Sequence, residues 1–553
     1  MTCVLTKLKS ITENWQSTDR VCTLMFDEIS LRRHLQYDIA HDVVIGFEDD
    51  GTRRTKDVGS TALVILLAGI VRNWVQPVAF AISKRQTNSS AIRTLLIGII
   101  EQLQEAGITV KAVICDQGTN NVSLAGLLNV STDEPFFEVK GTKVYFLYDT
   151  PHLMKCTRNN LRAHKLQIGS ETIDWTYIET LFKVTHDTSA DSIAAPNYHL
   201  KSRLAKKLTE RHIYRKPFSD MRVKYATQVM SESVAVALLT LLAIGELPAA
   251  AKPTADFLER MDKLFDCLNS SVVKQPGDKL RYAIKEQSEH ASFLEQCLPW
   301  IDSWRFGSAD KRQPHTIKGW QVTIKAVLLL WGELHQDLGF DSLLTRRDDT
   351  SFLLAELSTF PVSVLTTGAA QLGQASGDEA VQVYPSVSDT SPEVPDIVKD
   401  NVVYYVSGSL VKSFLRSKSA DCVCERFLTD EGPEQLHGSH QFYSLLAANN
   451  VPESLFGDLT APSDACYEYV QQLEARFLKK IDSLIHLGEV CQTISKTITS
   501  ETAVFCSKEC HERFVNMFAN TRLGWYLKFR NQSFHEQKSK HSVGAKKMRK
   551  LAH

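Results

Sequence analysis

The hydrophobic positions of the first 165 residues predict short buried strands. Apolar runs at Val21–Phe26, Val43–Phe47 and Thr61–Leu67 have the length of β-strands. The run Thr61–Leu67 is apolar at almost every position, which predicts a central strand buried on both faces. Two further strands are predicted at Val110–Cys115 and Val144–Tyr148. We therefore expect an α/β domain over residues 1–165.

A helix is predicted between the third and fourth of these strands. Ser89 and Ser90 are suitable N-cap residues, and Gly107 is suited to end the helix. Its apolar residues fall on one helical stripe: Ile92, Leu95, Leu96, Ile99, Ile100 and Leu103. The order strand–strand–strand–helix–strand is that of a ribonuclease-H-like domain, in which consecutive strands pair as a meander. The crossover helix then brings the fourth strand beside the first.

Two of the predicted strands end on an aspartate. Asp27 follows the first strand and Asp116 follows the fourth. In a ribonuclease-H-like sheet these strand ends are neighbours, so the two carboxylates could share divalent metal ions for phosphoryl transfer. Asp149 also follows a strand. For Asp149 a helix N-cap is the favoured interpretation, and a spare metal ligand is the alternative.

The pattern becomes helical after the α/β domain. Residues 166–340 contain amphipathic stretches at Val229–Ile244, Ala255–Leu268 and Trp320–Leu338. Residues 366–396 are poor in large apolar residues and rich in Gly, Ser, Pro and acidic residues, which predicts a linker or a disordered loop.

The remaining ordered region is predicted at residues 397–530 and is helical. Within it, Ser463 is suited to cap a long helix. Residues 531–553 form a basic tail, and we expect its part after Glu536 to be disordered. This tail is either a nuclear-localisation or DNA-backbone patch, or a plain solvated segment.

Charge, apolar runs, motifs and cysteine content limit the classes of protein to which the chain could belong. The net charge of −1 over 553 residues means that nucleic-acid binding would need local basic patches. No run of about 18 apolar residues occurs, so no membrane span is expected. Neither a P-loop motif nor a Gly-x-Ser-x-Gly nucleophile motif is present. The twelve cysteines are scattered, which suits reduced thiols in a cytosolic or nuclear protein.

Four cysteines in the C-terminal region raise the question of a zinc site. They are Cys422, Cys424, Cys506 and Cys510. Their spacings are not those of a standard zinc finger or ribbon. The sequence therefore favours buried free thiols over metal ligands.

Several short motifs distributed along the chain support a family assignment. They are Phe26-Asp27-Glu28, Cys115-Asp116-Gln117-Gly118-x-Asn120-Asn121, Asp149-x-Pro151-His152-Leu153-x-Lys155, Ala226-x-Gln228-Val229-x-Ser231 and Leu343-Leu344-Thr345-Arg346-Arg347. In combination they resemble the P-element transposases, including the host-domesticated relatives that carry an N-terminal THAP zinc finger. The resemblance extends over nearly the whole chain.

This resemblance implies a fold and an activity. The fold is a ribonuclease-H-like catalytic domain of the retroviral-integrase type, interrupted by a mostly helical GTP-binding insertion and followed by a helical C-terminal region. The implied activity is cut-and-paste cleavage and transfer of DNA at transposon ends in the nucleus, with Mg²⁺ or Mn²⁺ and assisted by GTP. By resemblance, Asp27 and Asp116 are catalytic metal ligands, and the family protein is a homo-oligomer with no membrane association.

The insertion would occupy residues 166–340 by the same resemblance. A lysine and an arginine can pair with phosphate oxygens, and a carboxylate can pair with guanine N–H groups. From the residues alone, Phe265 is equally well a core residue and Asp266 a solvated one. The implied nucleotide contacts are Lys207, Arg222, Val223, Ser231, Phe265, Asp266 and Asn269.

The chain departs from the family pattern at the third carboxylate. Residues 341–365 would form the C-terminal part of the ribonuclease-H-like domain, where the family's glutamate aligns with Leu354. Glu356 lies two residues later, about 200° around a helix, and is at best a weak substitute. Local divergence or a gene-model error over residues 348–396 would explain this departure. We therefore expect impaired catalysis; the alternative is a domesticated, non-catalytic relative that binds nucleic acid or proteins.

A second departure concerns the start of the chain. No THAP zinc finger or coiled-coil dimerisation segment is recognisable before residue 20. We therefore expect the site-specific DNA reader and the dimerisation segment to be missing from this chain.

Overall fold

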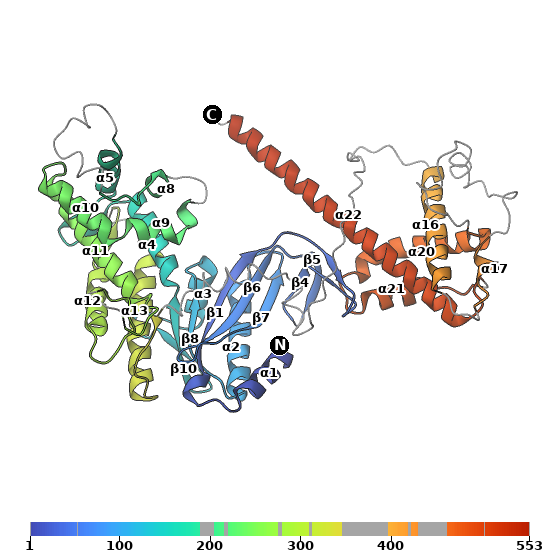
Figure 1. Ribbon diagram of the computed structural model, residues 1–553, viewed down its shortest axis with the longest axis horizontal. Helices are drawn as coiled ribbons and strands as arrows, with labels where there is room; N and C mark the ends of the chain where they lie inside the picture. The colour runs from blue at the N-terminus through green and yellow to red at the C-terminus, as the bar shows by residue number, and fades with distance from the viewer. Residues whose placement is uncertain are drawn as a thin grey trace. The chain divides into compact units, whose positions relative to one another are not determined.

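The computed structural model describes ten stretches of the chain (Figure 1). They are residues 2–51, 53–187, 204–214, 219–274, 279–308, 312–345, 396–417, 422–429, 462–502 and 504–551. The chain divides into two compact units, which we describe separately. The first unit comprises Met1–Ile29, Leu63–Phe80 and Gln86–Ala370, and the second comprises Ser30–Ala62, Ala81–Arg85 and Gln371–His553.

The first unit contains a mixed β-sheet with the strand order β7-β6-β1-β8-β10-β9. Strand β8 pairs in parallel with both β1 and β10, whereas β9 is antiparallel to β10. The prediction that the fourth strand returns beside the first is therefore confirmed. The bounds are β1 Val21–Ser30, β6 Thr61–Gly69, β7 Val75–Ser83, β8 Thr109–Cys115, β9 Phe136–Val139 and β10 Thr142–Tyr148.

The prediction of the second strand of the meander is wrong. The strands that follow β1 in the sheet are β6 and β7, whereas the segment Val43–Phe47 belongs to the second unit. There it forms two strands, because Gly46 has φ of +109°. A Cβ at this glycine would lie 2.1 Å from the carbonyl oxygen of His34, so only glycine fits the break.

Helices α1 (Thr2–Thr12), α2 (Ser89–Glu105), α3 (Thr119–Leu127), α4 (Thr150–Ala163) and α13 (His315–Gln336) accompany the sheet. The N-cap of α2 is Asn88 rather than Ser89 or Ser90, and its Oδ1 accepts the Ala91 N–H at 2.8 Å. Helix α13 is fixed to the sheet by Glu333, which pairs with Lys111 and accepts the Tyr145 hydroxyl at 2.7 Å.

The insertion of the first unit is mainly helical. Its helices are α5 (Thr176–His186), α8 (Glu210–Ile213), α9 (Val223–Val229), α10 (Glu232–Ala243), α11 (Lys252–Cys267) and α12 (His290–Asp302), beside a small sheet of β11 (Leu166–Ile168), β12 (Glu171–Ile173) and β13 (Trp304–Phe306). The predicted helix Val229–Ile244 is interrupted by Ser231, the N-cap of α10.

One segment, Val223–Ala243, is long and apolar enough to span a bilayer by length and composition. It comprises two helices, and 44% of its most apolar window is buried. A core helix of a globular domain has the same character, because both bury an apolar surface.

The second unit combines short strands from the N-terminal half with C-terminal helices. The strands are β2 (Gln36–Asp38), β3 (Val43–Ile45), β4 (Phe47–Asp49) and β5 (Arg54–Val58), and the helices are α16 (Asp396–Arg416), α17 (Glu425–Leu428), α20 (Asp464–Leu484), α21 (Val490–Ile498) and α22 (Lys508–Leu551). Leu35, Val44 and Phe47 are buried in one core with residues of these helices. Residues 1–165, which were predicted as the N-terminal part of the ribonuclease-H-like domain, are thus divided between the two units.

Two predictions for the C-terminal half can be compared with the structure. Ser463 caps α20, since its Oγ accepts the Cys466 N–H at 3.2 Å, so this prediction is confirmed. The prediction of disorder after Glu536 is wrong for residues 537–551, because α22 continues to Leu551. The tail contains many lysines and no proline, so the helix can continue. The predicted segments 341–365 and 366–396 lie almost wholly outside the described residues, which omit 346–395.

Candidate metal and nucleotide sites

Asp27 and Asp116 lie at the same end of two adjacent parallel strands. Met25 in β1 is paired with Ile114 in β8. Asp27 and Asp116 each follow these residues by two positions, so the register brings the two aspartates abreast. The side chains of paired residues on neighbouring strands are close enough to interact. The local fold therefore places two carboxylates at one edge of the sheet.

The loop after β8 orients the carboxylate of Asp116. Its Oδ1 accepts the Gly118 N–H at 2.9 Å and the Asn121 side-chain N–H at 2.7 Å. A Cβ at Gly118 would lie 3.0 Å from the same oxygen, so a larger residue would crowd the turn. The motif that follows β8 thus serves to hold one carboxylate in a fixed direction.

The electrostatics of Asp27 favour a cation. Burial, reinforced by the charge of Asp116, raises the pKa of Asp27 to about 6. The Glu28 N–H, which donates to Asp27 Oδ1 at 2.7 Å, and the charge of Lys155 act in the opposite direction. Two carboxylates held together in a partly buried site repel each other, and a divalent cation would relieve that repulsion. The donor set fits Mg²⁺ or Mn²⁺, which prefer oxygen ligands.

Asp149 acts as a helix cap, as predicted. It is only 3% exposed, and its Oδ2 accepts the His152 N–H at 3.0 Å at the start of α4. It also lies next to Asp116 in the sheet, because Tyr148 is paired with Cys115. A third acidic residue therefore lies at this edge of the sheet, with its carboxylate engaged by α4.

His152 lies beside the paired aspartates, although it was not predicted as a site residue. Its Nδ1 is 3.9 Å from Asp116 Oδ2. Burial and the charge of Lys155 lower the pKa of His152, whereas Asp116 opposes them. The lowered pKa favours a neutral imidazole beside the carboxylate. The position of His152, three residues after a strand-ending aspartate, is the sequence signal that could have identified it.

Glu28, the residue after Asp27, makes a contact near the same edge of the sheet. Its Oε1 accepts the Thr87 N–H at 2.6 Å and so ties β1 to the segment that leads into α2. Glu356, the weak candidate for a third catalytic carboxylate, lies outside the described residues.

The insertion contains a cavity of about 1240 Å³ between its helices. Five of the seven predicted nucleotide residues line it: Lys207, Ser231, Phe265, Asp266 and Asn269. Arg222 and Val223 are not among the lining residues. They begin helix α9, where the Arg222 guanidinium lies 5.9 Å from the ring centre of Tyr225.

Asp266 is the most buried charged residue of this cavity wall. It is only 4% exposed, so the alternative that Asp266 is a solvated residue is wrong. Its Oδ1 accepts the Arg281 Nε–H at 2.6 Å. Burial raises the pKa of Asp266, Arg281 counteracts this, and Asp262 adds to it. Phe265 is only partly buried, so it can contact both the core and the cavity.

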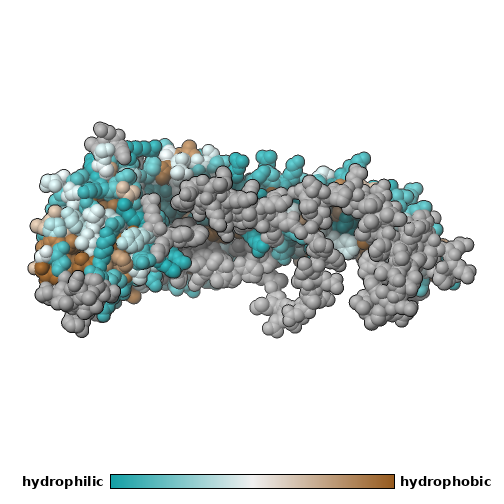
Figure 2. Space-filling view, turned by 90° about the horizontal axis from the view of Figure 1, so that it is seen from above, coloured by the Kyte–Doolittle hydropathy of each residue, from teal (hydrophilic) through white to brown (hydrophobic). Residues whose placement is uncertain are grey.

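The cavity wall also contains cationic residues that the sequence did not single out. Lys279 pairs with Glu232 at 2.8 Å and lies 3.6 Å from Asp262. Hydrophobic residues, coloured brown, form part of the surface over the insertion helices (Figure 2). Val236 of α10, which is 53% exposed, lines the cavity as well. The wall therefore offers apolar surface, positive charge and a buried carboxylate.

Comparison with known protein families matches two regions of the chain. Residues 1–129 match the TNP-like RNase H N-terminal domain. Residues 151–280 match the TNP-like GTP-binding insertion domain. These are the two parts of the chain that contain the paired aspartates and the cavity.

Two characterised proteins are similar in sequence. The transposable element P transposase of Drosophila melanogaster is 28% identical over 257 residues, which cover 46% of this chain and 30% of that protein. The DNA transposase THAP9 of Homo sapiens is 25% identical over 272 residues, which cover 47% of this chain and 28% of that protein. The matched region thus spans less than a third of the length of either relative.

A solved structure shows the same fold. The Drosophila P element transposase strand transfer complex aligns with a TM-score of 0.54 and 22% identity, covering 64% of this chain and 74% of that chain. The fold is therefore a ribonuclease-H-like domain with a GTP-binding insertion domain and a helical C-terminal region. Over these two domains the chain is similar to the P-element transposases.

Proposed function

We propose that this chain is a P-element-type transposase polypeptide that binds DNA and holds a divalent metal ion between Asp27 and Asp116. The observation that carries the proposal is the register of β1 and β8, which sets these two carboxylates abreast. The raised pKa of Asp27 supports it, because the buried carboxylate pair favours a bound cation.

Each residue of the site has a distinct task in this proposal. Asp27 and Asp116 hold the metal ion, and Asn121 directs Asp116 toward it. Such an ion, when bound, activates an attacking water or 3′-hydroxyl and stabilises the leaving oxygen. The charge of Lys155 lowers the pKa of Asp27, so Lys155 lies close to the site. Its positive charge would favour an approaching phosphate. The substrate would be the DNA of transposon ends, processed in the nucleus by an assembly of several chains.

We further propose that the cavity of the insertion binds GTP. Lys207 would contact phosphate oxygens, and Phe265 would pack against the base. Asp266 would accept guanine N–H groups through Oδ2, because its Oδ1 is already engaged by Arg281. The nucleotide would then favour assembly on DNA, since the chain has no P-loop for its hydrolysis.

Strand cleavage is expected to be weak in this proposal. The family's third carboxylate aligns with Leu354, and a leucine cannot bind a metal ion. Loss of one ligand of a catalytic metal costs orders of magnitude in rate. The same substitution favours the second candidate function, a domesticated relative that binds nucleic acid or proteins without catalysis.

Metal binding and strand cleavage are tested separately. Mn²⁺ titration followed by electron paramagnetic resonance should give a site that weakens at least about tenfold in Asp27→Asn and Asp116→Asn, whereas the exposed Asp133→Asn should leave it unchanged. Cleavage of labelled transposon ends is then measured with Mg²⁺ or Mn²⁺ and GTP. Metal binding that is insensitive to both aspartates would overturn the metal site, and robust cleavage that depends on Asp27 would overturn the prediction of weak catalysis.

Nucleotide binding is tested with a fluorescent GTP analogue and with ATP as competitor. Lys207→Ala should weaken binding about tenfold or more, as loss of a charge-assisted contact predicts. Asp266→Asn should reduce the preference for GTP over ATP. Lys263→Ala is the matched control, because Lys263 lies on α11 with Asp266 but does not line the cavity. Equal binding by all three variants would contradict a nucleotide site here.

A further inference from the structure

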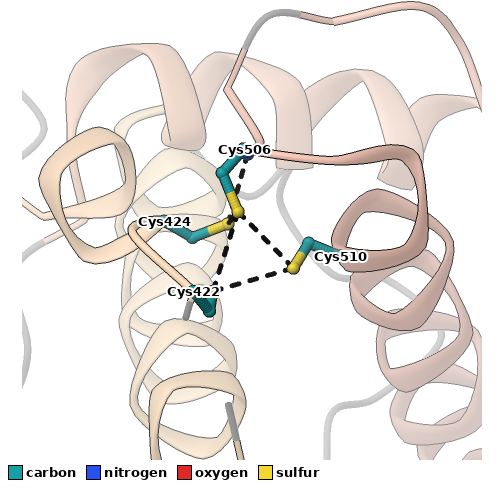
Figure 3. A group of neighbouring side chains, drawn as sticks. All are labelled: Cys422, Cys424, Cys506 and Cys510. Atoms are coloured by element: carbon teal, nitrogen blue, oxygen red, sulfur yellow. Dashed lines mark hydrogen bonds between the residues drawn. The ribbon is translucent and has the colours of Figure 1, made fainter. Parts of the chain in front are cut away.

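Four cysteines that are widely separated in sequence meet in the second unit (Figure 3). Cys422 and Cys424 precede helix α17, Cys506 precedes α22, and Cys510 lies in the first turn of α22. The four sulfur atoms all lie within 4.8 Å of one another. Figure 3 shows the side chains from two separate segments pointing toward one common centre.

The distances between the sulfur atoms match one tetrahedral ion. Sγ of Cys506 is 3.1 Å from that of Cys424, 3.6 Å from that of Cys510 and 3.8 Å from that of Cys422. Cys422 and Cys510 are 3.6 Å apart. A Zn–S distance of about 2.3 Å with tetrahedral angles requires sulfur atoms about 3.8 Å apart. One ion therefore fits at the centre of this group with only small shifts.

The surroundings of the sulfur atoms suit thiolates. The Cys506 N–H donates to Cys424 Sγ at 3.3 Å, which is the kind of backbone contact that supports a metal-bound thiolate. Cys510 lies in the first turn of the 44-residue helix α22, where the helix dipole favours negative charge. Cys422 and Cys424 are buried, whereas Cys506 is exposed and leaves a route for a metal ion to enter.

Neither a disulfide nor a purely hydrophobic group of cysteines matches this arrangement as well. A disulfide needs a sulfur–sulfur distance of about 2.05 Å, and it would join only two of the four thiols. A group of four hydrophobic cysteines would need no common centre for its sulfur atoms. Four thiolate ligands disfavour oxygen-preferring cations, and a tetrahedral set of four sulfur ligands suits zinc or iron. A closed set of four cysteines is typical of structural zinc sites.

We propose that Cys422, Cys424, Cys506 and Cys510 bind one structural zinc ion. All four positions of the ion are taken by protein ligands, so the site is closed and has no position for a substrate. The ion would tie the segment before α17 to the start of α22, across 82 to 88 residues of chain. This role is independent of the proposed metal site at Asp27 and Asp116.

The test measures the metal content of the full chain. Protein purified under reducing conditions without chelator is analysed by inductively coupled plasma mass spectrometry. The expected result is one zinc ion per chain. Replacement of zinc by Co²⁺ should give the charge-transfer and d–d absorption bands of a tetrahedral thiolate site, which identify sulfur ligands directly. Co²⁺ bound at Asp27 and Asp116 would have oxygen ligands and would lack the charge-transfer bands.

Variants locate the site. Cys510→Ser and Cys424→Ser should each reduce the zinc content from one ion per chain to near zero. Cys491→Ser is the matched control, since Cys491 is buried in the same core but is not part of the cluster, and it should keep one zinc ion. Should the cluster variants not fold, the Co²⁺ spectrum of the unaltered chain still decides the question. Wild-type protein without zinc, a Co²⁺ spectrum without thiolate bands, or a Cys424–Cys506 disulfide found by mass spectrometry would overturn the proposal.

Discussion

The carboxylate of Asp42 caps helix α21 at Cys491, 449 residues further along the chain. Its Oδ1 accepts the Cys491 N–H at 2.7 Å, and its Oδ2 accepts the Gln492 N–H at 3.1 Å. The carbonyl oxygen of Asp42 also accepts the Val490 N–H at 2.8 Å. Three donors at the start of one helix are therefore satisfied by a single residue of the N-terminal half, so the segment around Asp42 is part of the C-terminal helical core.

Replacement of Asp42 should destabilise the second unit. Asp42→Ala removes the cap of α21 and places alanine at a φ of +49°, which together should cost about 2–3 kcal/mol. Asp42→Asn keeps an acceptor oxygen and tolerates this backbone conformation, so it should cost about 1 kcal/mol or less.

The second unit can be observed by itself, because Trp525 is its one tryptophan among the eight of the chain. Urea unfolding is followed by ¹⁹F NMR of fluorotryptophan-labelled protein, with the Trp525 resonance assigned through Trp525→Phe. Resonances of the other tryptophans should be unaffected by either change at Asp42. Equal stability of the alanine and asparagine variants would contradict the cap.

The sequence predicted those elements whose formation depends on residues close together in the chain. Strand β8 and helix α2 were found from periodicity, because a buried strand and an amphipathic helix each leave a signal within a short window. The positions of Asp27 and Asp116 followed from the connectivity of the ribonuclease-H-like fold. The cap at Asn88 was missed by one residue, as is usual for helix ends.

Contacts between distant segments could not be predicted. The side chain of Asn531 accepts the Leu35 N–H and donates to the Leu35 carbonyl oxygen, each at 2.8 Å, across 496 residues. No periodicity within a window reports such a pairing. The four cysteines were considered as zinc ligands from the sequence, but free thiols were favoured because their spacing is not that of a standard zinc motif; only the fold brings the four sulfur atoms together.

Asp27 should lower the stability of the first unit at neutral pH. Its pKa is raised from 3.8 to about 6, so between these pH values the folded chain binds a proton that the unfolded chain releases. The free energy of unfolding therefore falls as the pH rises through this range, and the penalty is complete above pH 6. Asp27→Asn should raise the free energy of unfolding by about 1–3 kcal/mol at pH 7.5 and have almost no effect below pH 4.

The measurement is urea unfolding by tryptophan fluorescence at both pH values without divalent metal. Asp133→Asn, an exposed site, serves as the control. Addition of Mg²⁺ should stabilise the wild-type chain and not the Asp27→Asn variant, because the ion binds the charged pair. A variant that is less stable than wild type at pH 7.5 would show that the carboxylate is not under repulsion.

Gly319 sets the distance between helix α13 and the loop that follows β8. A Cβ at Gly319 would lie 2.2 Å from Gln117 Nε2 and 2.7 Å from Leu153 Cδ2. The Gln117 amide donates to the His315 carbonyl oxygen at 2.8 Å, so it cannot move without losing this bond. Gly319→Ala should therefore destabilise the first unit by about 1–3 kcal/mol and weaken Mn²⁺ binding at the adjacent Asp116.

The same helix provides the control. At Gly332 no atom of the described residues lies within 4 Å of the added Cβ, so Gly332→Ala should stabilise the unit by about 0.5–1 kcal/mol through helix propensity alone. Opposite signs for the two glycine-to-alanine changes in urea unfolding are the expected result. If both Gly319→Ala and Gly332→Ala stabilised the unit, the loop after β8 would be able to move away from α13 at no cost in stability.

Removal of the proposed zinc ion should loosen the second unit and leave the first unit intact. A structural zinc site contributes several kcal/mol to folding, and a unit of this size loses about 2–4 °C in midpoint for each kcal/mol. Treatment with a zinc chelator should thus lower the thermal midpoint reported by Trp525 by roughly 10 °C, and added Zn²⁺ should restore it. The chelator should not affect Cys424→Ser, because that variant already lacks the ion. A midpoint that falls equally at the tryptophans of both units would instead indicate a general effect of the chelator.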